Sequence, residues 1–77
     1  MITIPKLMAN VLRIREDRIG EKTRMQDIAE WDSLKHMELI VAIEQAYGIE
    51  LTGDEIADMT SISSIKQIVG QRGVSWT

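Results

Sequence analysis

Apolar residues recur at helical spacing along the first part of the chain. They follow the i, i+3, i+4, i+7 rule for one buried helix face, at Ile4, Leu7, Met8, Val11 and Leu12. Thr3 stands where a capping residue is needed, and Pro5 suits the first turn of a helix. The pattern predicts a first helix over about residues 4–15.

The longest helical pattern runs from Ser33 to Tyr47, between Asp32 as N-cap and Gly48 as the residue that ends it. This predicted helix has two apolar faces. The face expected to point into the core holds Leu39, Ile40, Ile43, Ala46 and Tyr47. The opposite face, called here the second stripe, holds Leu34, Met37 and Val41, with Glu38 and Glu44 beside it.

Two more helices are predicted after this one, and Ile49 and Leu51 are expected to anchor the crossover to them. The T-x-x-E sequence from Thr52 to Glu55 is a capping box for a short third helix over about 53–58. Ser61 can cap a fourth helix near 62–70, which Gly70 or Gly73 would end. Its apolar face is formed by Ile62, Ile65, Ile68 and Val69. Residues 74–77 are expected to form a loose tail, although Trp76 could pack back on the bundle.

Residues 16–32 show no sustained period and predict a long connection. Ile19 and Ile28 are its expected anchors, Met25 is a further candidate, and a short helical turn is expected around Met25–Ile28. Connections of this length in small domains are often functional. No stretch alternates with period 2, so the predicted fold is all-α. It is a single domain over 1–77, a four-helix bundle of three longer helices and a short third one.

The composition narrows the classes of function. The 77 residues include no Cys and one His, which excludes disulfides and thiolate metal sites and leaves no typical zinc site. The apolar runs are short and interrupted by charge, and the N-terminus lacks the pattern of a signal peptide. We therefore expect no bound metal, no membrane segment and a cytoplasmic location. A monomer is expected because the bundle should consume most of its apolar surface.

Charge is distributed unevenly along the chain. Residues 31–60 carry seven Asp and Glu and one Lys, whereas the flanking segments are weakly basic. An acidic middle disfavours nucleic acid and attracts a partner with a basic surface.

Two interpretations of the second stripe stay open at this point. It is a docking surface with an acidic rim, or the 16–32 connection folds over it.

A hydrolase interpretation would make Asp32, Ser33 and His36 a catalytic set. The sequence EWDSLKH has none of the glycines that a nucleophile elbow requires, and triads are rarely assembled from neighbours in sequence. His36 is expected instead to be a surface or boundary residue near the helix start. No catalytic residue is predicted.

Ser33 lies in the first turn of the predicted helix. Unpaired backbone N–H groups and the positive end of the helix dipole favour a phosphate attached to its hydroxyl. A serine beside an Asp cap is also a common placement that needs no function, so both interpretations remain.

The run Asp32-Ser33-Leu34, then Glu38-Leu39, AIEQAYGIEL and the acidic capping box, resembles the acyl carrier protein family over nearly the whole chain. The resemblance implies that Ser33 accepts 4′-phosphopantetheine from coenzyme A through a magnesium-dependent phosphopantetheinyl transferase. The thiol of this arm then holds an acyl or aminoacyl group as a thioester for loading and transferring enzymes, and the carrier itself is not catalytic.

The same resemblance implies roles for the residues around Ser33. Asp32 would cap the helix and help to engage the transferase. The residues implied to meet partner enzymes are Leu34, Met37, Glu38 and Val41.

Departures from the fatty-acid pattern indicate a different pathway. Trp31 precedes and Lys35 follows the D-S-L sequence, and W-D-S-L-x-H resembles discrete carriers of polyketide or nonribosomal peptide pathways. It also resembles small stand-alone carriers of unusual units. Trp31 can equally be a large apolar residue that anchors the connection on the bundle. The alternatives are a fatty-acid-synthesis carrier and an unmodified helical adaptor of carrier-like shape.

Overall fold

The computed structural model describes residues 3–73. Over this range the chain forms four α-helices and, between the first two, two single 3-10 turns. The elements are α1 Ile4–Leu12, η1 Glu16–Arg18, η2 Met25–Asp27, α2 Ser33–Tyr47, α3 Gly53–Asp58 and α4 Ile62–Gln71. Residues 3–73 include no β-strand, and the prediction of three longer helices and a short third one is confirmed.

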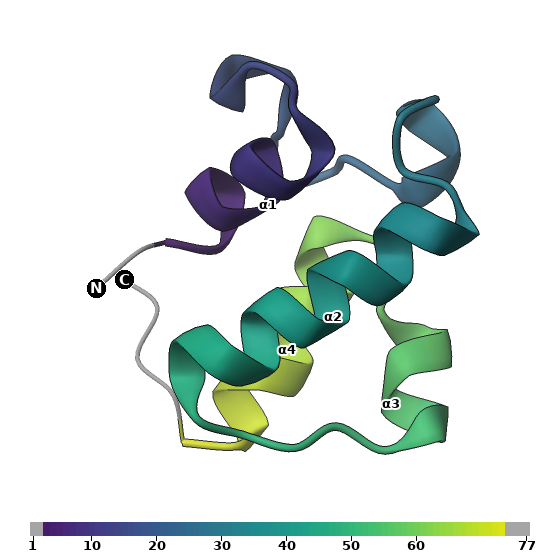
Figure 1. Ribbon diagram of the computed structural model, residues 1–77. Coiled ribbons are helices and arrows are strands. Elements are labelled where there is room, and N and C mark those ends of the chain that lie inside the picture. The colour runs from purple at the N-terminus through teal and green to yellow at the C-terminus, as the bar shows by residue number, and fades with distance from the viewer. Residues whose placement is uncertain (1–2, 74–77) are drawn as a thin grey trace.

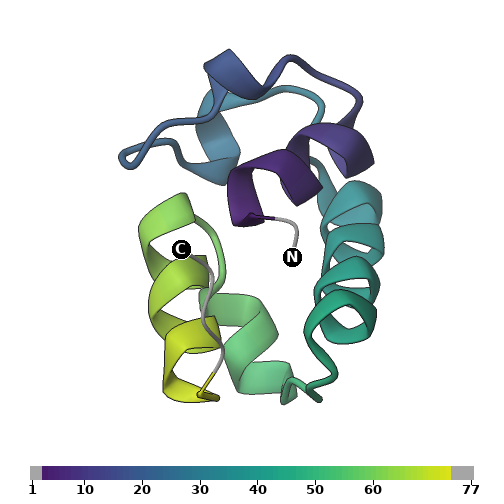
Figure 2. The same cartoon turned by 90° about the vertical axis from the view of Figure 1, so that its left-hand side faces the viewer.

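The helices enclose one core. α2 and α4 stand on opposite sides of it, with α1 near one end and α3 near the other (Figure 1; Figure 2). α1 packs mainly on α2, and α3 contacts α4. The most completely buried side chains are Ile4, Met8, Leu12, Leu39, Ile40, Ile43, Met59, Ile62, Ile65 and Val69. None of the helices in the described part of the chain is long and apolar enough to cross a membrane.

α1 ends earlier than the sequence predicted, at Leu12 instead of residue 15. Arg13 adopts the left-handed conformation, with φ 58° and ψ 46°, and its N–H donates to the Ala9 carbonyl. The N–H of Ile14 donates to the same carbonyl at 3.1 Å, and the Ile14 side chain packs on the core. This is a Schellman-type ending, in which the apolar contact after the turn stabilises the early stop.

The long connection is tied to the rest of the bundle. Ile19 and Ile28 are buried and Met25 is partly buried, as predicted, and η2 provides the predicted helical turn. An isolated antiparallel bridge joins Arg24 to Ser61. In this bridge, called here the loop clip, Met25 N donates to the Thr60 carbonyl at 2.7 Å and Ile62 N to the Thr23 carbonyl at 2.9 Å.

The bounds of α2 agree with the prediction, and the core face agrees in part. Leu39, Ile40 and Ile43 are buried and Tyr47 is half-buried, but Ala46 is exposed. The prediction for Ala46 was wrong because, at about 100° per residue, it lies at the edge of the face that Ile43 and Tyr47 turn toward the core. Gly48 then turns the chain at φ 66°, in the left-handed region that favours glycine.

The two C-terminal helices have the predicted caps. The Thr52 hydroxyl accepts from Glu55 N while the Glu55 carboxylate accepts from Thr52 N, and Ser61 caps α4 through Ser64. α4 continues to Gln71, so Gly70 lies inside it and Gly73, at φ 79°, lies beyond it. The expected tail over 74–77, with Trp76, lies outside the described residues.

Candidate functional site

Asp32 and Ser33 form the start of α2. The Asp32 carboxylate accepts a hydrogen bond from Lys35 N at 2.9 Å, and its carbonyl accepts from His36 N at 2.8 Å. The predicted cap is therefore confirmed. The backbone N–H groups of Ser33 and Leu34 precede the first intrahelical hydrogen bond. They face solvent at the positive end of a 15-residue helix.

The Ser33 hydroxyl is accessible. Ser33 is exposed, and within residues 3–73 its hydroxyl makes no hydrogen bond. An unpaired hydroxyl at a helix N-terminus is open to a transferring enzyme, and the adjacent N–H groups and dipole favour a phosphate there. The residues at this end of α2 therefore fit a phosphate-linked prosthetic group.

His36 does not serve Ser33 as a base. Contrary to the expectation of a surface or boundary residue, it is buried, with 9% of its surface exposed. Its Nδ1 accepts from the Trp31 indole Nε1–H at 3.0 Å, and its Nε2 lies 2.9 Å from the Ile56 carbonyl oxygen. Both ring nitrogens are engaged away from Ser33, so Asp32, Ser33 and His36 form no catalytic triad.

The second stripe of α2 lies open to solvent. Leu34 is 71% exposed, Met37 52% and Val41 47%, so the long connection does not fold over them. Large apolar side chains gathered on one helix face are typical of a docking surface. Glu38 lies beside them and pairs with Lys35 at 3.1 Å.

Glu44 has a structural role that its predicted place beside the stripe did not indicate. Its carboxylate accepts from the backbone N–H of Leu51 at 2.8 Å. This bond fastens the crossover after α2 to the helix itself. Glu44 is half-buried and is therefore less available at the edge of the second stripe than Glu38.

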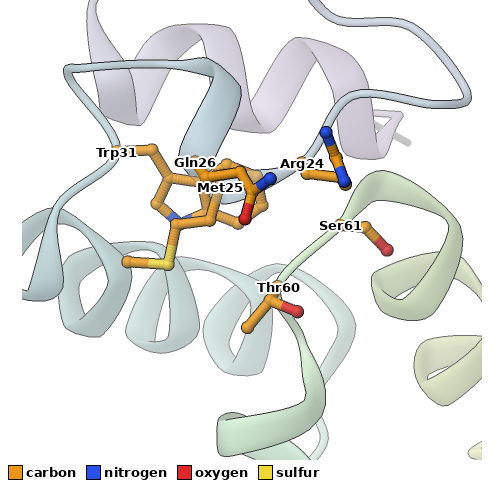
Figure 3. Close-up of a pocket in the computed structure, with 6 residues that line it drawn as sticks. All are labelled: Arg24, Met25, Gln26, Trp31, Thr60 and Ser61. Carbon is orange, nitrogen blue, oxygen red and sulfur yellow. The ribbon is translucent and has the colours of Figure 1, made fainter.

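A pocket opens next to this site, between the long connection and the turn that joins α3 to α4 (Figure 3). Its volume is about 540 Å³, and it is lined by Arg24, Met25, Gln26, Trp31, Thr60 and Ser61. Trp31, Met25 and Gln26 form one side, and Thr60 and Ser61 the other. Trp31 thus connects the pocket to the segment that precedes Ser33.

Comparison with known proteins agrees with this geometry. Residues 3–69 match the family described as the phosphopantetheine attachment site. The acyl carrier protein of Buchnera aphidicola subsp. Baizongia pistaciae (strain Bp) is 35% identical over 66 residues, which cover 86% of this chain and 85% of that protein. The chain belongs to the acyl carrier protein family. As an acyl carrier protein it is a non-catalytic carrier whose cofactor is covalently attached 4′-phosphopantetheine, as the sequence predicted.

Sequence reasoning did not find the pair formed by Trp31 and His36 in this carrier. Trp31 is 2% exposed, so its expected role as an anchor is confirmed, but its hydrogen bond to His36 was not foreseen. The five-residue spacing in sequence allows a Trp just before a helix to reach a His in its first turns. Whether it does depends on the path of the long connection, which only the structure shows.

Proposed function

We propose that this acyl carrier protein carries its 4′-phosphopantetheine on Ser33 and delivers acyl or aminoacyl groups between enzymes of a polyketide, nonribosomal peptide or related secondary pathway. The observation that carries the assignment of Ser33 is its exposed, unpartnered hydroxyl at the capped start of α2. The prosthetic group supplies a thiol that holds the acyl group as a thioester. The chain itself has no Cys that could do so.

The residues around Ser33 prepare it for a reaction that another enzyme catalyses. Asp32 fixes the first turn, and the free N–H groups favour the phosphate that becomes attached. No side chain of residues 3–73 hydrogen-bonds the hydroxyl, so the base that takes its proton comes from the transferase in this proposal. The bond formed joins Ser33 Oγ to the pantetheine phosphate, and the nucleotide half of coenzyme A leaves.

Intact mass after incubation with coenzyme A, Mg²⁺ and a broad-specificity phosphopantetheinyl transferase tests the attachment site. The wild type is expected to gain one phosphopantetheine, and Ser33→Ala to gain none. Ser63→Ala is the matched control, because Ser63 is an exposed serine on α4. No gain by folded wild-type protein with several transferases would favour the unmodified adaptor instead.

The pathway is tested by the loading enzyme that the modified protein accepts. Trp31 and Lys35 around the D-S-L sequence support a secondary pathway, with fatty-acid synthesis as the alternative. Loading by amino-acid adenylating or polyketide acyltransferase enzymes, with poor loading by fatty-acyl ligases, is the expected result. Preferential loading with long fatty acyl groups would support the alternative.

The second stripe is the surface proposed for partner enzymes, with Glu38 at its edge. Leu34→Ala and Met37→Ala are expected to weaken binding to the transferase about tenfold or more, since central apolar contacts carry most interface energy. Gln67→Ala, at an exposed position on α4, is the control and should bind normally. Surface plasmon resonance measures all three, and unchanged affinity in both α2 variants would remove the stripe from this interface.

A further inference from the structure

His36 links three segments of the chain. It lies in α2, accepts from Trp31 in the connection before Ser33, and contacts the carbonyl of Ile56 in α3. Trp31 is 2% exposed and His36 9%, so water competes little for either bond. Trp31 and His36 thereby join the N-terminal end of α2 to α3.

The chemistry of the two partners determines the state of the imidazole. A carbonyl oxygen only accepts, so Nε2 must carry a hydrogen and donate to Ile56. An indole nitrogen only donates, so Nδ1 must be without a hydrogen and accept from Trp31. His36 is therefore held as the neutral Nε2–H tautomer.

Protonation of His36 is incompatible with this arrangement. It places a hydrogen on Nδ1, which then faces the indole N–H donor 3.0 Å away. Because the indole N–H points at Nδ1, the imidazole lies at the edge of the indole, where the aromatic quadrupole is positive; the ring centroids are 5.9 Å apart. Only the bond to Trp31 is lost, because the Nε2–H donor to Ile56 is present in both states.

Most charged groups on the elements that carry this pair are engaged elsewhere. On α2, Asp32 caps Lys35 N and Lys35 pairs with Glu38. On α3, Glu55 precedes Ile56 and is bonded to Arg72, while in the connection Glu30 is bonded to Arg18. The remaining acids of α3, Asp54 and Asp58, are exposed.

No ion pair joins His36 to a carboxylate among residues 3–73. A positive imidazole ring would therefore have no ionic partner to replace the lost Trp31 bond.

We propose that His36 is a positioning residue whose neutral tautomer holds Trp31 and α3 together, and whose protonation releases Trp31 while α3 stays bound. The pocket of about 540 Å³ that Trp31 lines gives the released indole space to move. Trp31 directly precedes the Asp32 cap, so its release loosens the approach to Ser33. The effect on modification of Ser33 rests on the proposed function.

Nuclear magnetic resonance of the full-length wild-type chain tests the proposal without a substitution. At about pH 7.5, the ¹⁵N shifts of His36 should show the Nε2–H tautomer and the Trp31 indole N–H should be protected from exchange. The sample is then acidified until the ¹⁵N shifts show that both ring nitrogens carry a hydrogen. In that state indole exchange should rise about fivefold or more, the factor that corresponds to one net hydrogen bond. A protected indole beside a protonated ring would overturn the proposal, as would a ring that stays neutral.

Two variants separate positioning from general destabilisation. In His36→Gln the amide supplies one acceptor and one donor but cannot titrate, so the Trp31 indole signal should no longer respond to pH. In Trp31→Phe the indole donor is absent, and acidification should not alter the start of α2. A pH response of the indole in His36→Gln equal to that of the wild type would refute the role of His36.

The effect on modification is measured as the ratio of transferase rates, wild type to His36→Gln, at each pH. The ratio cancels the pH dependence of the enzyme. It should be constant while the resonance experiment shows a neutral His36 ring, and change over the pH range in which that experiment shows the ring protonated. A constant ratio would refute the effect on modification. Absence of modification at every pH would instead contradict the assignment of Ser33, and the resonance experiment would still decide the role of His36.

Discussion

Asp32 and Ser33 are neighbours with separate tasks. Asp32 satisfies a backbone donor at the start of α2 and makes the turn rigid. Ser33 has no such task, and this leaves its hydroxyl available to an enzyme. A fixed backbone with a free side chain is what a modification site needs, because the enzyme meets one geometry and displaces no internal bond.

Replacing the cap should therefore affect stability and leave the Ser33 hydroxyl in place. Asp32→Ala is expected to lower the free energy of unfolding by about 1 kcal/mol, the usual contribution of an N-cap. Asp32→Asn should retain most of this stability, since its amide oxygen can accept from Lys35 N. Urea denaturation measures both variants. An equal loss in the two would show that the negative charge stabilises α2 and that the capping bond does not.

Among the helices, α3 depends most on its surroundings. Six residues are too few to form a stable helix alone. The capping box satisfies its first turn, His36 donates to its Ile56 carbonyl, and the Arg72 guanidinium after α4 donates to both oxygens of Glu55. α3 is thus positioned by side chains from α2 and from the end of α4.

The bond from Arg72 makes the stability of this arrangement depend on pH. Hydrogen bonds from the Arg72 side chain, and then from the Thr52 backbone, hold the pKa of Glu55 below its ordinary value of 4.5. The unfolded chain therefore binds a proton there at a higher pH than the folded chain does. The stabilisation is complete above the ordinary pKa and is lost as the pH falls through the folded-state value.

Urea midpoints between about pH 6 and pH 3 test this expectation, over the range in which carboxylates titrate. Glu55→Gln can keep the capping box but cannot titrate, so its midpoint should fall less with acid than that of the wild type. Part of the fall should remain. The backbone N–H of Arg24 lowers the pKa of Asp27, and the Arg18 side chain lowers that of Glu30. Identical acid profiles in the two proteins would exclude Glu55 as a contributor.

The elements that the sequence predicted well are those with local causes. The bounds of α2 and α3 follow from caps a few residues away. Helix periodicity placed Leu34 opposite the core face but left open whether the connection covers it, and only the structure shows that it is exposed. The end of α1 and the burial of His36 depend on where Ile14 and Trp31 dock, which is decided by contacts between distant segments. Periodicity carries no information about such contacts.

At the scale of the whole molecule, an acidic side chain and the exposed apolar second stripe lie on the same side of α2. The net charge is −3, and the segment from 31 to 60 holds most of the acid. Glu38 is placed beside the exposed second stripe, so long-range attraction would bring a basic partner to the apolar contacts that then hold it.

This arrangement predicts salt-sensitive association. Stopped-flow measurement of binding to the transferase should show an association rate that falls as ionic strength rises from about 0.01 to 0.5 M, while dissociation changes little. Glu38→Gln should lower the rate at low salt and flatten its salt dependence. Glu16→Gln, at an exposed position in η1, is the control of equal charge change. A wild-type association rate that does not change with salt would show that electrostatic steering plays no part in this association.

The loop clip has a consequence for the order in which the chain becomes structured. Helices form from near neighbours within about a microsecond, whereas the pairing of Arg24 with Ser61 must wait until segments nearly half the chain apart have met. α3 lies next to that pairing and takes its remaining support from other elements. We therefore expect it to be the last helix fixed during folding and the first released in native-state opening, a small cooperative unit at the low-stability end of the molecule.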